Sequence, residues 1–98
     1  MQERVMVDII SEPTVEELLA NIARILVDKP GEVVVVASSG ERGTNLRLKV
    51  HPTDVGKIIG KQGRTARSLR TILGAISVKV GHRYYLDIVE ETNKDSEE

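Results

Sequence analysis

The chain has 98 residues and a formal net charge of −1, and 40% of its residues are hydrophobic, 30% charged and 2% aromatic. This length fits one domain with an aliphatic core, and the absence of cysteine excludes disulfide scaffolds, thiolate zinc sites and cysteine nucleophiles. Because no apolar run approaches the roughly 18 residues of a membrane span and no signal peptide is recognisable, we expect a soluble, cytoplasmic domain without a membrane partner.

The first predicted element is a helix. Residues 1–12 are apolar in part but do not alternate clearly, and we interpret 1–13 as an N-terminal extension. Thr14 and Glu17 then form a capping-box pattern, which predicts that a helix begins there. Pro30 ends it, since proline cannot continue a helix and disfavours helical geometry in the residue before it. The expected apolar stripe consists of Val15, Leu18, Leu19, Ile22, Ile25 and Leu26.

Two strands follow. Residues 33–36 are four valines, which favour a strand, and residues 38–43 have the composition of a loop. Leu46, Leu48 and Val50 then alternate with two cationic residues, as in a strand with one buried and one solvated face. The short connection predicts an antiparallel hairpin.

The second half of the chain predicts two helices and a last strand. A short helix opens at Pro52, residues 60–63 interrupt it, and a longer helix begins near Arg64 and is capped by Gly81. Residues 84–88 alternate as a strand, so that one of Tyr84 and Tyr85 should face the helices and the other solvent or a partner. Residues 91–98 form an acidic tail that we expect to be disordered. The expected core stripe of the longer helix consists of Ala66, Leu69, Ile72, Leu73 and Ile76.

The order of these elements indicates a fold class. A strand–helix–helix–strand crossover is long enough to place the third strand parallel to the second. We therefore predict an α+β domain with a three-stranded mixed sheet and helices packed on one face.

Net charge conceals a basic segment. Residues 1–40 carry three basic and seven acidic side chains, residues 41–83 carry ten and two, and residues 84–98 carry one and six. A concentrated positive segment in a neutral chain suits a phosphate-bearing partner, although a solvated cationic face gives the same count.

Residues 60–63, the glycine loop, lie inside this basic segment. Gly60 and Gly63 flank Lys61 and Gln62 between the two helices, so the turn carries little side-chain bulk and another backbone can approach it. Amides at the start of the next helix favour an anion. A glycine turn that only connects two helices is the alternative. A P-loop is excluded, because the spacing from Gly56 to Gly60 is one residue short.

These residues resemble a known family. The run from Ile58 to Arg64 is similar to the IIGKxGxx signature of KH domains, and the element order resembles the type II, bacterial form of the fold. Over residues 14–90 the chain resembles the small bacterial KhpA/YlqC family of KH RNA-binding proteins. Two features depart from that pattern: residues 1–12 are additional, and Thr65 stands where an aliphatic residue is expected.

The resemblance implies a function and a site. KH domains hold about four single-stranded nucleotides with this loop on the sugar–phosphate backbone. It implies single-stranded RNA as the ligand and a role as an RNA chaperone or post-transcriptional regulator, sometimes tied to cell shape. It also implies a homodimer, or a heterodimer with a Jag/KhpB-type KH protein. The implied RNA-binding residues are Gly56, Lys57, Ile58, Ile59, Gly60, Lys61, Gln62, Gly63, Arg64 and Arg67, with Arg42 and Arg83 within reach.

The sequence predicts no enzyme. His51 and His82 show neither metal-ligand nor base–nucleophile spacing, and no pair of carboxylates shares a helix face in the basic segment, so we expect no metal and no cofactor. Two other functions stay open: an assembly protein whose main role is KH–KH pairing, and a factor that binds ribosomal RNA through the same loop.

Overall fold

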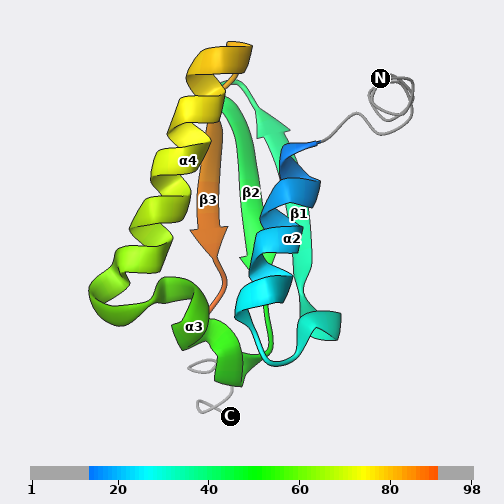
Figure 1. Ribbon diagram of the computed structural model, residues 1–98. Helices are drawn as coiled ribbons and strands as arrows, with labels where there is room; N and C mark the ends of the chain where they lie inside the picture. Colours follow the sequence, from blue (N-terminus) through cyan, green and yellow to red (C-terminus); the bar gives the residue numbers. More distant parts are fainter. Residues whose placement is uncertain (1–13, 91–98) are drawn as a thin grey trace, which may run out of the picture.

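The computed structural model describes residues 14–90 (Figure 1). The expectations for the extension 1–13 and the acidic tail 91–98 lie outside the described residues. In chain order the elements are α2 (Val15–Leu26), a 3-10 turn (Pro30–Glu32), β1 (Val34–Gly40), β2 (Gly43–Lys49), a 3-10 turn (Pro52–Asp54), α3 (Val55–Ile59), a 3-10 turn (Lys61–Gly63), α4 (Arg64–Val80) and β3 (Tyr84–Ile88).

The sheet has the order β1-β2-β3, and helices α2 and α4 cover one of its faces (Figure 1). Strands β1 and β2 are antiparallel, whereas β2 and β3 are parallel, with Leu46 opposite Leu86 and Leu48 opposite Ile88. This arrangement confirms the predicted α+β class and the mixed three-stranded sheet.

Strand β1 is longer than predicted. Residues 38–43 were expected to be a loop, but Ser38 pairs with Asn45 and Ser39 with Thr44, so only Glu41 and Arg42 lie in the turn. The prediction was wrong because it rested on side-chain polarity. An edge strand that is exposed along most of its length needs backbone pairing rather than apolar side chains.

Helix α2 begins where the sequence predicted, since the Thr14 hydroxyl accepts a hydrogen bond of 3.1 Å from the Glu17 amide. Its buried face differs from the predicted stripe. Leu19, Ala20 and Ala23 face the core, whereas Leu18 is 40% exposed and Ile25 is 83% exposed. Small alanine side chains let the helix approach the sheet closely, which turns the larger residues toward solvent.

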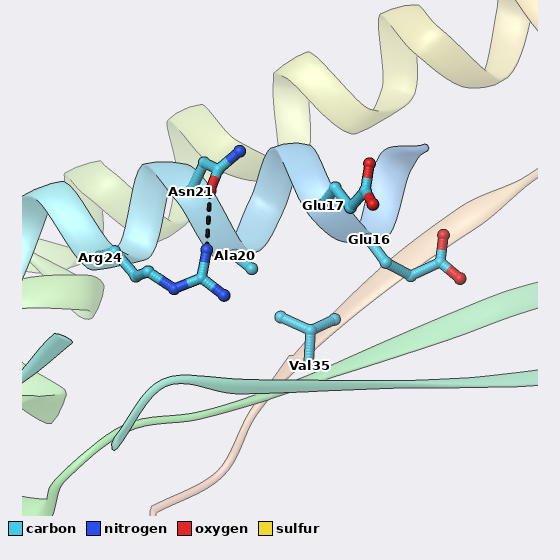
Figure 2. A pocket seen from close by; sticks show the side chains of 6 residues that line it. All are labelled: Glu16, Glu17, Ala20, Asn21, Arg24 and Val35. Carbon is cyan, nitrogen blue, oxygen red and sulfur yellow. Dashed lines mark hydrogen bonds between the residues drawn. The ribbon is translucent and has the colours of Figure 1, made fainter. Parts of the chain in front are cut away.

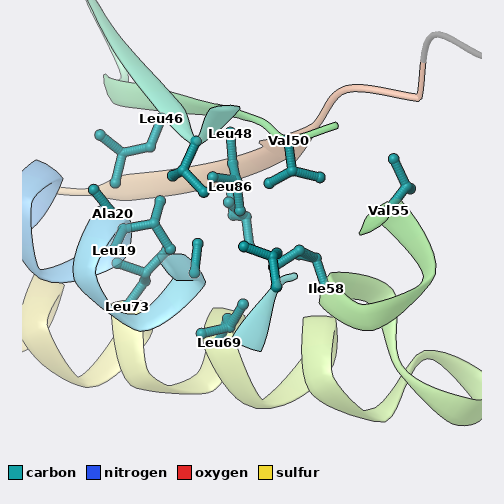
Figure 3. Close-up of a cluster of buried hydrophobic side chains, with 13 residues drawn as sticks. Leu19, Ala20, Leu46, Leu48, Val50, Val55, Ile58, Leu69, Leu73 and Leu86 are labelled. Atoms are coloured by element: carbon teal, nitrogen blue, oxygen red, sulfur yellow. The ribbon is translucent and has the colours of Figure 1, made fainter. Parts of the chain in front are cut away.

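The core lies between the sheet and the helices (Figure 3). Leu46, Leu48 and Ile58 have no exposed surface, and β3 contributes Leu86. Helix α4 buries the predicted Ala66, Leu69 and Leu73, but Ile72 is 44% exposed, because it lies to one side of the face that meets the sheet. Gly81 caps α4 in the left-handed conformation, as predicted. Within residues 14–90 the structure has no helix of the length and apolarity needed to cross a membrane.

Candidate nucleic-acid interface

The glycine loop connects α3 to α4 at the outer corner of the helical layer (Figure 1). Gly60 has φ 81° and ψ 168°, and Gly63 has φ 75° and ψ 14°. A Cβ atom at Gly60 would lie 2.7 Å from the Thr65 Cβ, which is too close for any side chain. Gly60 therefore has two reasons to be glycine, whereas Gly63 has only its left-handed backbone.

Gln62 is the one non-glycine residue with positive φ in the described part of the chain, at φ 58° and ψ 25°. This conformation costs an ordinary side chain on the order of 1 kcal/mol. Three of the four loop residues are thus left-handed or in a glycine-only region. The loop keeps this shape because Gly63 donates to the Gly60 carbonyl at 3.0 Å and Arg67 donates to the Gln62 carbonyl at 3.2 Å.

The loop presents donors outward. Lys61 and Gln62 begin the 3-10 turn, so their N–H groups have no partner within it. Both side chains are exposed, as are those of Arg64 and Arg67. Within residues 14–90, none of these three cationic side chains forms an ion pair with a carboxylate. The result is an exposed, uncompensated positive surface around orphan amides, which suits an anion such as phosphate.

Lys57 lies in a different setting from the loop cations. Its ammonium is 3.3 Å from an Asp28 oxygen and 3.3 Å from an Asp54 oxygen, and hydrogen bonds with Asp28 and Asp54 raise the pKa of Lys57. The Lys57 ammonium therefore lies between two carboxylates. Asp28, Asp54 and Lys57 together form what we call the acidic bracket, which joins α3 to the end of α2. Asp28 is 29 residues away in sequence, so inspection of the loop alone gave no sign of this pairing.

Asp54 is the buried member of that bracket, with a side chain that is 1% exposed. Burial raises the pKa of Asp54, but hydrogen bonds from the backbone amides of Lys29 and Asp28 and from Lys57 outweigh it, so the pKa lies below its ordinary value. The bond from the Lys29 amide measures 3.0 Å. An ionised carboxylate, bonded to the Lys29 amide through one oxygen and paired with the Lys57 ammonium through the other, thus holds the start of α3, and with it the glycine loop, against the rest of the fold.

The ten residues predicted for RNA binding fall into three groups. The exposed side chains of Lys61, Gln62, Arg64 and Arg67 form one surface around the half-buried Gly60 and Gly63, and Gly56 is exposed as well. Ile59 is half-buried next to the loop, whereas Ile58 is fully buried in the core. Lys57 points into the acidic bracket.

The sequence prediction placed Arg83, directly before β3, within reach of the RNA, but it did not predict the backbone donors and acceptors at the free edge of β3. Its alternate residues Tyr84 and Leu86 direct their backbone groups away from β2, because Arg83 and Val89 bond to β2. Ser77 accepts from the Tyr84 amide at 3.0 Å, and Arg70 donates to the Leu86 carbonyl at 3.2 Å. The Tyr84 carbonyl and the Leu86 amide between them also point to this edge.

A groove extends from this edge to the far end of α4. It has a volume of about 520 Å³ and includes Gly74, Arg83 and Tyr85 among its lining residues. Arg42 lies instead beside another hollow, at the hairpin end of the sheet. The three-residue spacing of Arg64, Arg67 and Arg70 was the available sequence signal for the path between the loop and this groove.

Comparisons with known proteins agree with this geometry. The family model described as KhpA/KhpB, KH domain matches residues 16–88. RNA-binding protein KhpA of Treponema pallidum is 55% identical over 75 residues, which cover 76% of this chain and 94% of the relative. The proteins of the same name from Clostridium acetobutylicum and Aquifex aeolicus are 47% and 45% identical over 76% of this chain, and the matches cover 99% and 95% of those relatives. None of the three names indicates an enzyme. A family match over more than half of the chain, on a mixed sheet with an exposed glycine loop, shows that the chain belongs to the KhpA/KhpB family of KH-domain proteins.

Proposed function

We propose that the protein binds single-stranded RNA by clamping the sugar–phosphate backbone on the glycine loop. The observation that carries this proposal is the loop itself, where the Lys61 and Gln62 amides have no partner within the turn and lie beside cations that pair with no carboxylate of residues 14–90. Relatives at 45–55% identity carry the name RNA-binding protein. Phosphate contacts of this kind give affinity that depends on salt but not on sequence.

The bases would lie between α4 and the free edge of β3. Arg67 and Arg70 line the α4 side of this path, and the backbone groups of Tyr84 and Leu86 line the strand side. An adjacent carbonyl and amide present one acceptor and one donor to the edge of an unpaired base. Such an arrangement suits a single strand, because the base edges of a duplex are already paired.

One copy of this site contacts about four nucleotides, and a stretch of four nucleotides is too short to select one target RNA among many. We therefore include a second KH domain in the proposal, either another copy of this chain or a Jag/KhpB-type protein, because two linked sites raise affinity through effective concentration. Acting as a pair, the protein would serve as an RNA chaperone or post-transcriptional regulator in the cytoplasm.

An assembly protein is the second candidate, and the apolar residues exposed on the helical layer favour it. Ile25 is 83% exposed and Ile72 is 44% exposed, and a partner that covers either residue would remove apolar surface from water. On this alternative the domain mainly pairs with another KH chain and RNA contact is incidental. Binding of ribosomal RNA would use the same glycine loop and is a choice of target rather than a different site.

The deciding experiment reverses the charge of the loop. The double variant Lys61→Asp/Gln62→Asp should lose binding to short single-stranded RNA in fluorescence anisotropy. Its circular dichroism spectrum and its oligomeric state in solution should stay unchanged. A matched control, Lys79→Asp/Asn45→Asp, makes the same change in net charge on exposed or half-exposed residues away from the loop and should retain binding. Wild-type affinity in the loop variant would refute the clamp.

A further inference from the structure

Strand β1 forms the second free edge of the sheet, on the side opposite β3. Thr44 and Leu48 of β2 bond to β3, so by alternation Asn45 and Arg47 bond to β1. Their partners Ser38 and Val36 therefore direct their amides and carbonyls toward β2. By alternation, the backbone groups of Val35, Ala37 and Ser39 point away from β2, and within residues 14–90 no strand pairs with them.

This edge lacks the usual protection against strand pairing. The seven residues Val34–Gly40 include no charged residue and no proline, and three of them are valine. Six of the seven residues are exposed. Natural edge strands are commonly blunted by lysine, proline or bulges, and an unprotected β-branched edge is a template for another strand.

A groove runs along the same edge between β1 and α2 (Figure 2). Its volume is about 430 Å³, and it is lined by Glu16, Glu17, Ala20, Asn21, Arg24 and Val35. The two glutamates lie at the start of α2, whereas Arg24 lies near its end and, among residues 14–90, bonds through its side chain to Asn21 alone, at 2.7 Å. A strand placed here would meet negative charge at one end of the groove, Val35 in the middle and positive charge at the other end.

We propose that the groove binds residues 4–10 of a second copy of this chain, added antiparallel to β1. In a strand, Arg4, Met6 and Asp8 share one face, and Arg4 and Asp8 lie about 13 Å apart. Glu17 and Arg24 are separated by about 10 Å along the helix axis. Arg4 beside Glu17 and Asp8 beside Arg24 satisfy both charges and place Met6 over Val35.

The chain's own residues 4–10 cannot take this place. In the matched orientation the strand runs about 20 Å from the start of α2 toward its end. Residues 11–13 would then have to return to Thr14, and they span at most about 14 Å. A second copy has no such limit, and a two-fold arrangement fills both grooves at once.

The inference goes beyond RNA binding and does not depend on it. Residues 4–10 lie outside the family match to residues 16–88, and the groove lies across the sheet from β3. A dimer formed in this way leaves both glycine loops accessible.

The test is a charge swap in the full chain, followed by sedimentation equilibrium. Asp8→Arg and Arg24→Glu each place like charges together at two symmetric positions, so each should raise the dimer dissociation constant about tenfold or more. The double variant Asp8→Arg/Arg24→Glu restores opposite charges and should return to within about threefold of the wild type. A dimer that is insensitive to all three variants, or a wild-type chain that is monomeric at every concentration, would overturn the proposal.

A second variant tests the strand edge itself. Ala37→Pro removes an amide that faces the open edge without removing a bond between β1 and β2, and it should weaken the dimer, whereas Ala37→Ser should not. Amide hydrogen exchange supplies a direct measure. The amides of Val35, Ala37 and Ser39 should be protected in the wild-type dimer and exchange rapidly in Arg24→Glu. If these amides stay protected in a monomeric variant, another segment occupies the edge, and the proposed addition of a strand from a second copy is refuted.

Discussion

The loop geometry predicts that its two glycines respond very differently to alanine. At Gly63, with φ 75° and ψ 14°, alanine meets only the left-handed backbone, since the nearest atom to its Cβ would be an Arg67 nitrogen at 3.9 Å. The expected loss of unfolding free energy is about 1 kcal/mol. At Gly60, with φ 81° and ψ 168°, the backbone lies in a region that is essentially restricted to glycine.

A second term adds to the cost at Gly60. The alanine Cβ would also lie 2.7 Å from the Thr65 Cβ and 2.8 Å from the Thr65 amide nitrogen, and a backbone atom cannot move aside as a flexible side chain can. We therefore expect Gly60→Ala to cost about 3 kcal/mol or more. A domain of this size has a total stability of about 4–11 kcal/mol, so the variant loses a large share of it.

Urea denaturation followed by circular dichroism measures both losses, with Gly74→Ala as the control. Gly74 is helical and has nothing within 4 Å of its built Cβ, so alanine there should stabilise the fold by roughly 1 kcal/mol. Equal losses for Gly60→Ala and Gly63→Ala would show that the Thr65 contact does not limit the loop. A gain in stability at Gly60 would refute the backbone assignment altogether.

Two further predictions concern salt and pH. Contacts to about three phosphates give a slope near −2 in log affinity against log salt, and Arg67→Gln should reduce its magnitude by about 0.7 while Lys79→Gln leaves it unchanged. Because the folded-state pKa of Asp54 lies below its unfolded value, its stabilisation is present above the unfolded pKa and is lost as pH falls through the folded pKa. Urea titrations should show that Asp54→Asn costs more at pH 7 than below pH 3. An Asp54→Asn cost that does not change with pH would contradict the lowered pKa of Asp54. An unchanged salt slope for Arg67→Gln would contradict the phosphate contact of Arg67.

Local patterns in the sequence predicted the elements that depend on local chemistry. The alternation of Leu46, Leu48 and Val50 predicts which face of β2 is buried, and the length of the crossover allows the parallel direction of β3. The glycine loop was recognisable because its conformation depends on Gly60 and Gly63 themselves. These features need no knowledge of distant residues.

Features that join distant segments were not predictable in this way. The bracket of Asp28, Asp54 and Lys57 connects residues up to 29 positions apart, and each member is an ordinary surface charge when its own surroundings in the sequence are considered. The buried face of α2 depends on how closely Ala20 and Ala23 approach the sheet, and hydrophobicity alone ranks Ile25 above both alanines. Packing and long-range pairing decided these cases.

The basic side chains of α4 show how one spacing can serve two contacts. Steps of three residues fall about 60° short of a full helical turn, so Arg64, Arg67 and Arg70 do not form a straight stripe but wind around the helix. Arg64 lies beside the loop, Arg67 reaches back to the Gln62 carbonyl, and Arg70 has turned far enough to reach the Leu86 carbonyl on β3. A four-residue spacing would have kept the cations closer to one line along α4. The observed winding instead carries positive charge from the phosphate-binding loop to the strand edge, along the path that a bound single strand would follow.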